Sequence, residues 1–201
     1  MDAFFKIAAY LFHPLWVSTI GVGLYFWVTP RYITSDMVWS KMAIVFILTF
    51  LIPVLFYFLL KALNVISSVH VENVKERRIP LFLQLALFFL IIKIVFQPYF
   101  YPELYYFFVA GLYSTLTALI LVLFNFKASL HMMGVAALSM FLIALSIHFK
   151  INTLGLIAIS FFIVGWVASS RLHTKSHTPI ELVFGFVLGF IPQLILVNFW
   201  L

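Results

Sequence analysis

Long, uninterrupted apolar segments constrain this chain more than any other feature. A bilayer-spanning helix needs about 20 mostly apolar residues. Seven segments approach or exceed that length: 7–28, 41–63, 81–97, 104–124, 129–148, 151–169 and 180–200. With 65% hydrophobic and only 9% charged residues, the 201-residue chain holds more apolar side chain than a water-soluble fold of its size can bury. The sequence therefore predicts a protein whose solvent is mostly lipid.

The length and continuity of these segments also predict the fold class. Backbone polar groups inside a bilayer must be satisfied within the protein, so spanning segments are helices or a closed barrel. Uninterrupted segments of this length favour helices, and no repeat, low-complexity linker or soluble segment separates them. We therefore expect an all-α, polytopic membrane bundle of about six to seven transmembrane helices. Residues 1–201 form a single integral membrane domain, and the first segment is expected to be a retained helix rather than a signal peptide.

The charged residues narrow the classes of partner. The chain has no cysteine, which excludes disulfides and thiolate metal sites. Its formal net charge is +6, and the basic residues lie mainly in short connections between apolar segments. This placement favours anionic lipid headgroups or phosphate as partners and argues against nucleic acid. The sequence does not predict an oligomeric state.

Polar residues gather in three connections, residues 64–80, 125–131 and 170–181. These connections follow the second, fourth and sixth apolar segments. Because an even number of membrane crossings separates them, we expect all three at the same membrane face. Their polar side chains are therefore candidates for one shared site.

The third connection contains a pair of residues suited to catalysis. His177 and Glu181 are four residues apart, which places them one turn apart on one side of a helix that starts near Thr178. A carboxylate in that position can fix the imidazole tautomer and leave the other ring nitrogen as a nucleophile or base. The same spacing fits a helix capping box, with Thr178 as N-cap and Glu181 as its partner. Both interpretations stay open, and they are compatible. Arg171 adds a planar set of donors for phosphate oxygens.

Ser170-Arg171, five residues, His177, three residues and Glu181 together resemble the third signature of the type-2 phosphatidic acid phosphatase family. That signature reads Ser-Arg-x5-His-x3-Asp, so Glu181 replaces an aspartate. The second connection is similar to the family's second signature, Pro-Ser-Gly-His at a helix start, in part. Here the residues are Ala128-Ser129-Leu130-His131, in which Ser and His match while Leu130 stands where the glycine allows close approach of a ligand.

The first connection resembles the family's first signature, Lys-x6-Arg-Pro, only loosely. The chain reads Lys75-Glu76-Arg77-Arg78-Ile79-Pro80, in which Ile79 separates the Arg-Pro pair and Val71 occupies the position of the lysine. Three cations within four residues still make a suitable phosphate clamp. A basic connection that only anchors lipid headgroups is the alternative.

The resemblance implies an integral membrane phosphatase that hydrolyses a lipid phosphate or diphosphate through a phosphohistidine intermediate, with no metal or cofactor. His177 would attack phosphorus, Glu181 would orient it, and His131 would protonate the leaving group. The residues expected to bind the phosphate are Lys75, Arg77, Arg78, Ser129 and Arg171. Two alternatives stay open: a relative without catalysis that binds lipid headgroups or a membrane partner, and a small transporter or structural subunit whose three polar connections do not converge.

The charge distribution leaves the orientation of the chain in the membrane open. Eight of the 12 Lys and Arg residues fall on the face of the three polar connections, which the positive-inside rule would place in the cytoplasm. Six of those eight lie within the three polar connections that form the candidate site, and without them the balance reverses. The family resemblance implies a bacterial inner-membrane protein with its active site on the periplasmic face.

Overall fold

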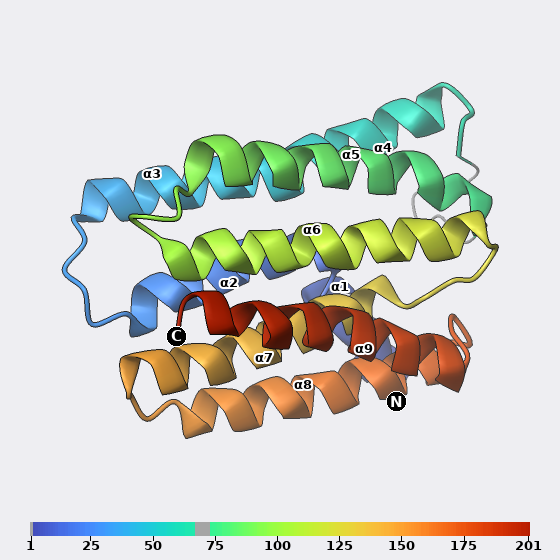
Figure 1. The fold of residues 1–201 in the computed structure, drawn as a ribbon. Coiled ribbons are helices and arrows are strands. Elements are labelled where there is room, and N and C mark those ends of the chain that lie inside the picture. The colour runs from blue at the N-terminus through green and yellow to red at the C-terminus, as the bar shows by residue number, and fades with distance from the viewer. Residues whose placement is uncertain (1, 67–72) are drawn as a thin grey trace.

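The computed structural model describes residues 2–66 and 73–201, and every regular element within those ranges is a helix (Figure 1). Six stretches are long and apolar enough to cross a membrane. They are Ser35–Ala62, Lys75–Val95, Pro102–Leu123, Leu130–Phe149, Leu154–His173 and Pro179–Phe199. The prediction of an all-α polytopic bundle with six to seven spans is confirmed.

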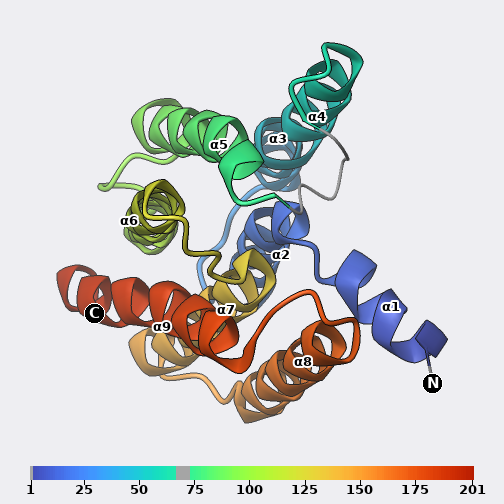
Figure 2. The same cartoon turned by 90° about the vertical axis from the view of Figure 1, so that its right-hand side faces the viewer.

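The first apolar segment does not form the single helix expected from its hydropathy. It divides into α1 (Asp2–Leu11) and α2 (Pro14–Val28), which leave the break in different directions (Figure 2). Pro14 is the cause, because a proline disfavours helical backbone at the residue before it. His13 has an extended conformation, with φ −61° and ψ 136°. Consequently α1 packs against a distant helix, α8 (Leu154–His173), while α2 enters the bundle.

Two of these spans, Ser35–Ala62 and Lys75–Val95, each contain a π-helical turn. Ile47–Leu51 joins α3 (Ser35–Phe46) to α4 (Ile52–Ala62), just before Pro53, which has no N–H for the helical ladder. The span Lys75–Val95 begins with the 3₁₀ turn Lys75–Arg77, continues as α5 (Arg78–Leu90) and ends with the π-helical turn Ile91–Val95. This span starts earlier than its apolar segment, so its basic residues lie in the first turns of a helix rather than in a connection.

The remaining spans pack around α7 (Leu130–Phe149), the most deeply buried of the six. It contacts α2, α8, α6 (Pro102–Leu123) and α9 (Pro179–Leu196), which ends in the 3₁₀ turn Val197–Phe199. Gly185 and Gly189 allow α9 to approach α7 closely, as small residues do between membrane helices. A Cβ at Gly185 would lie 2.5 Å from the Ser129 carbonyl oxygen, and one at Gly189 would be closer still to the carbonyl of Met133.

The three polar connections reach the same end of the bundle, as predicted. In Figure 1 the start of α5, the α6–α7 connection and the α8–α9 connection all lie on the right-hand side, which faces the viewer in Figure 2. Part of the first connection, residues 67–72, lies outside the described residues. The α2–α3 and α7–α8 connections lie at the opposite end, together with the C-terminus (Figure 1).

Candidate active site

His177 occupies the short connection between α8 and α9, directly before the N-cap of α9. Its Nδ1 lies 2.9 Å from Oε2 of Glu181. The same oxygen accepts the backbone N–H of Thr178 at 3.0 Å, and the Thr178 hydroxyl accepts the backbone N–H of Glu181 at 3.4 Å. The capping box and the histidine–carboxylate pair, which the sequence left as compatible alternatives, are both present in the structure.

The hydrogen bond to Glu181 fixes the chemistry of the His177 ring. A carboxylate can only accept, so Nδ1 carries the proton and the lone pair of the neutral ring lies on Nε2. Burial lowers the pKa of His177 from 6.5 to about 4; the bond to Glu181 opposes this shift, and the positive charges of Arg77 and Lys127 add to it. The ring is therefore neutral at physiological pH, with a nucleophilic Nε2.

Arg77 connects the first polar connection to the other two. Its side chain is half-buried, and Nη1 donates to the carbonyl oxygen of Ala128 at 3.4 Å. Its charge acts on both His177 and Glu181. This places a guanidinium beside the histidine–carboxylate pair, and a guanidinium can donate paired hydrogen bonds to an anion.

His131 lies in the first turn of α7, and Ser129 is the N-cap of that helix. The Nε2 of His131 lies 3.1 Å from the carbonyl oxygen of Ala9 in α1, so Nε2 carries the proton and donates. Ser129 is fully buried, and its hydroxyl accepts the backbone N–H of Met132 at 3.4 Å. The Ser129 side chain therefore caps α7, and its backbone N–H donates to the carbonyl of Glu181 at 3.0 Å.

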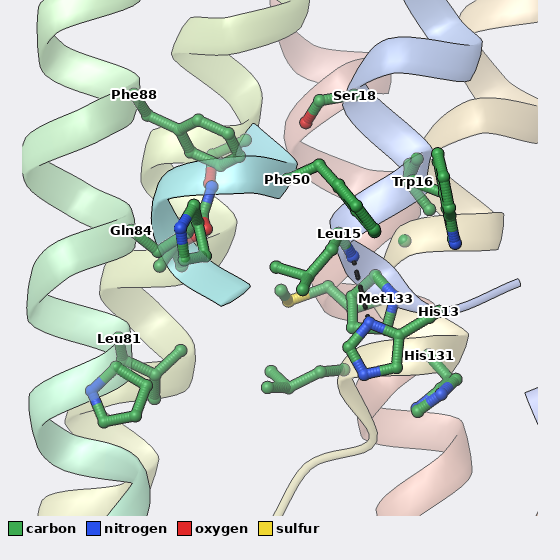
Figure 3. A pocket seen from close by; sticks show the side chains of 18 of the residues that line it. His13, Leu15, Trp16, Ser18, Phe50, Leu81, Gln84, Phe88, His131 and Met133 are labelled. Carbon is green, nitrogen blue, oxygen red and sulfur yellow. Dashed lines mark hydrogen bonds between the residues drawn. The ribbon is translucent and has the colours of Figure 1, made fainter. Parts of the chain in front are cut away.

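A cavity of about 490 Å³ brings several of these side chains together. Arg77, His131 and His177 line one end of it, at the level of the polar connections. The rest extends between α2, α4, α5, α6 and α7 and is lined mostly by apolar and aromatic side chains (Figure 3). Binding pockets commonly combine an apolar wall with a few polar groups that fix the ligand's orientation.

His13 joins this site, although sequence reasoning did not select it. Its Nδ1 accepts the backbone N–H of Leu15 at 3.4 Å, so it caps α2, and its ring meets the His131 ring edge to face with centroids 5.2 Å apart. Both rings line the cavity (Figure 3). The available sequence signal was a histidine next to a proline inside an apolar segment, where ionisable residues are costly and are commonly functional.

The other predicted phosphate-binding residues lie outside the cavity wall. Lys75 is exposed, whereas Arg78 and Arg171 are half-buried, and Arg171 acts electrostatically on His131. Within the described part of the chain, the Nε atoms of Arg78 and Arg171 are buried without a hydrogen-bond partner. Both guanidinium groups lie at this end of the bundle, and neither lines the cavity.

No group of three or more histidine, aspartate or glutamate side chains suited to a metal ion occurs among residues 2–66 and 73–201.

Comparison of the chain with protein-family models, with curated proteins and with solved structures finds no match. The resemblance to the type-2 phosphatidic acid phosphatase family therefore stays a prediction, carried by the residues quoted above.

Proposed function

We propose that this chain is an integral membrane phosphatase that hydrolyses a lipid phosphate or diphosphate. The observation that carries the proposal is the placement of His177. It is a neutral, carboxylate-bound histidine on the wall of a cavity that also presents Arg77 and His131. A nucleophile held by an orienting group, with a cation and a second histidine beside it, is the arrangement that covalent phosphoryl transfer requires.

In the proposed first step, Nε2 of His177 attacks phosphorus and the bond to the lipid leaving oxygen breaks. The ring becomes a positively charged phosphoimidazole, which the carboxylate of Glu181 stabilises through Nδ1–H. A doubly protonated His131, whose Nε2–H stays bonded to the Ala9 carbonyl, gives its Nδ1 proton to the departing oxygen. Arg77 neutralises charge on the phosphoryl oxygens, and the unpartnered donors of Arg78 and Arg171 support such a charge from nearby.

In the proposed second step, water attacks the phosphorus and the P–N bond breaks. His131 takes a proton from the attacking water, which returns it to the state that can protonate the next leaving group. Inorganic phosphate is released, and Nε2 of His177 regains its lone pair. Atoms and charge balance over the two steps without a further reactant.

The cavity favours a lipid over a soluble phosphate ester as the substrate. Its polar end lies at the level of the connections, where a headgroup sits, and its apolar walls continue into the bundle. A hydrocarbon chain that enters from the bilayer would meet apolar walls there and would not have to contact water. The six spans are consistent with a multi-pass membrane protein. The family resemblance alone leads us to propose a bacterial inner membrane and a site that faces the periplasm.

A relative that binds lipid headgroups without turnover is the second candidate. Two observations favour it: the hydroxyl of Ser129 is used as a helix cap, and Leu130 lines the cavity where the family signature has glycine. Under this proposal the same cavity holds an anionic lipid, and no P–O bond breaks. Replacing His177 would then have little effect on lipid binding.

Phosphate release by detergent-purified protein separates the two candidates. The substrates are phosphatidic acid, phosphatidylglycerol phosphate, undecaprenyl diphosphate and a lipid A phosphate, each assayed with a chelator present. We expect turnover that survives the chelator and is lost in His177→Ala. His173→Ala is the matched control, because His173 is exposed on the same connection, away from the cavity wall. Equal activity of His177→Ala and wild type would exclude the proposed mechanism, and no release from any lipid would favour the binding-only relative.

A further inference from the structure

A second hollow, of about 450 Å³, opens at the end of the bundle opposite the candidate active site. We call it the opposite hollow. Its wall comes from the α2–α3 connection, α3, the end of the Lys75–Val95 span and the connection to α6. The polar side chains on this wall include Arg31, Lys41 and Gln97, and none of the described residues that line it is acidic. The opposite hollow is therefore a basic pocket at the level of the membrane surface.

Arg31 is held in place by a fully buried carboxylate. Its Nη2 lies 2.7 Å from Oε1 of Glu103, and its Nη1 donates to Oε2 at 3.3 Å. Tyr25 donates to Oε2 at 3.3 Å, and His148 reaches Oε1 at 3.0 Å. The Arg31 side chain is nevertheless 41% exposed and lines the opposite hollow. Because the buried Glu103 fixes the orientation of its guanidinium, Arg31 is suited to bind a ligand that enters the hollow from the surface.

Lys41 contributes a second cation, and it has no acidic partner. It lies six residues into α3, about 9 Å along the helix from Ser35 at 1.5 Å per residue. Its ammonium donates to the carbonyl of Val95 and lies 5.8 Å from the centre of the Tyr101 ring. Among the described residues no carboxylate reaches ion-pair distance of Lys41. A lysine near a helix end keeps its ammonium at the membrane surface, where an anionic headgroup can reach it.

We propose that the opposite hollow binds the phosphate of an anionic phospholipid in the leaflet opposite the candidate active site. Arg31 is paired with Glu103, whereas Lys41 has no carboxylate within ion-pair distance among the described residues, so the wall carries one uncompensated positive charge. A phosphodiester supplies that charge and accepts hydrogen bonds from Arg31, Lys41 and the Gln97 amide.

The surroundings of the opposite hollow favour a lipid over free phosphate. Tyr32 is 93% exposed beside it, as expected for an aromatic residue at the headgroup level. Ile94 belongs to the wall and is 67% exposed, so the apolar side of the hollow continues onto the surface that faces lipid chains. The proposal does not depend on phosphatase activity, because none of its residues belongs to the candidate active site.

The test measures which lipids the protein retains. Wild type is reconstituted in nanodiscs with equal amounts of phosphatidylglycerol and phosphatidylcholine of matched chains, and native mass spectrometry counts the lipids that stay bound. We expect Lys41→Gln to lower the ratio of retained phosphatidylglycerol to phosphatidylcholine about fivefold, which corresponds to about 1 kcal/mol for one basic residue near an anionic headgroup. Lys93→Gln is the matched control: it removes the same charge near the same end of the bundle, but Lys93 lies over the Phe89 ring and does not line the hollow.

Three outcomes would overturn the proposal: an unchanged ratio in Lys41→Gln, an equal fall in Lys93→Gln, or displacement of the retained lipid by excess inorganic phosphate. The last result would indicate a site for soluble anions. If Lys41→Gln does not fold, Gln97→Leu tests the same wall from an exposed position. It is expected to lower the ratio in the same direction, and an unchanged ratio there would also contradict the proposal.

Discussion

One carboxylate oxygen of Glu181 holds His177: Oε2 accepts Nδ1–H at 2.9 Å, and it also accepts the backbone N–H of Thr178 at 3.0 Å. A single side chain thus caps α9 and orients the proposed nucleophile. Stability and activity therefore both depend on this side chain. A substitution that keeps a hydrogen-bond acceptor preserves the cap, whereas one that removes the acceptor loses the cap as well.

Glu181→Gln retains an acceptor for both hydrogen bonds but removes the negative charge. We expect the fold to be preserved and phosphate release to fall about 10- to 100-fold, because a hydrogen bond to a charged group is worth about 1.5–3 kcal/mol. Glu181→Ala should lose activity and also destabilise α9 by about 1 kcal/mol through the lost cap. Thermal unfolding in detergent, measured beside turnover, distinguishes the variants. Full activity of Glu181→Gln would show that the charge has no part in the reaction.

The pKa of His177 predicts how stability depends on pH. Because the pKa is lowered from 6.5 in the unfolded chain to about 4 in the folded protein, the unfolded state binds more protons between these values. The contribution of His177 to stability is complete above pH 6.5 and is lost as the pH falls through about 4. His177→Gln removes this dependence. The difference in unfolding midpoint between wild type and His177→Gln should therefore shrink as the pH falls from 6.5 to 4, and a constant difference would contradict the shift.

The features that could be predicted from the sequence are those that depend on the length of apolar segments, on the number of crossings or on the spacing of nearby residues. Apolar length predicted the six spans from Ser35 onward but not the division of the first segment at Pro14, and the parity of crossings predicted that the three polar connections lie at one end. The four-residue spacing of His177 and Glu181 gave both their hydrogen bond and the capping box. These features are local, or they follow from the order of the spans, and so they need no knowledge of how the helices pack.

Contacts between distant helices could not be predicted in this way. Arg77 and Arg78 are adjacent, yet only Arg77 lines the cavity. Successive helical residues point about 100° apart, and the direction of each depends on where the helix starts, which apolar length did not give. Glu103 meets Arg31 across 72 residues of sequence, and this pairing depends on how α2, α6 and α7 are arranged at the opposite end.

The close approach of α9 to α7 predicts opposite effects for two glycines. Gly189→Ala would place a methyl group against the backbone of Met133, so we expect destabilisation of about 1–3 kcal/mol as α9 moves away. Gly165→Ala in α8 meets nothing within 4 Å and should be neutral or stabilising by up to about 1 kcal/mol, because alanine has the higher helix propensity. Unfolding midpoints in the same detergent compare the two. Equal midpoints for both variants would contradict the packing of α7 against α9.

The buried carboxylate at the opposite end should matter for stability and not for turnover. Glu103→Gln weakens the contacts with Arg31 and His148 and removes the charge that Arg31 faces. Because Arg31 is 41% exposed and can be hydrated, we expect destabilisation of about 1–3 kcal/mol, the range for a lost hydrogen bond to a charged group. Activity per folded molecule should stay unchanged, because Glu103 is remote from the candidate active site. Asp36→Asn, at an exposed position in the first turn of α3, is the control and should change neither quantity. A loss of turnover in folded Glu103→Gln would indicate coupling between the two ends.

His13 has two separable roles, as the cap of α2 and as a ring against His131. Asparagine is among the best N-cap residues, so His13→Asn should preserve the helix start and remove only the ring. If the ring helps to position His131 or the phosphate, turnover should fall about tenfold or more at an unchanged unfolding midpoint, within the range that a positioned acid–base group contributes. His13→Ala removes the cap as well and should lower both turnover and the midpoint.

The pH dependence of turnover, measured in His13→Asn and wild type, tests the link to His131. If the His13 ring influences proton transfer by His131, the pH profile of turnover changes in His13→Asn. If His13 is only a structural cap, the profile stays the same. Wild-type turnover and an unchanged profile in His13→Asn would assign His13 to the cap alone.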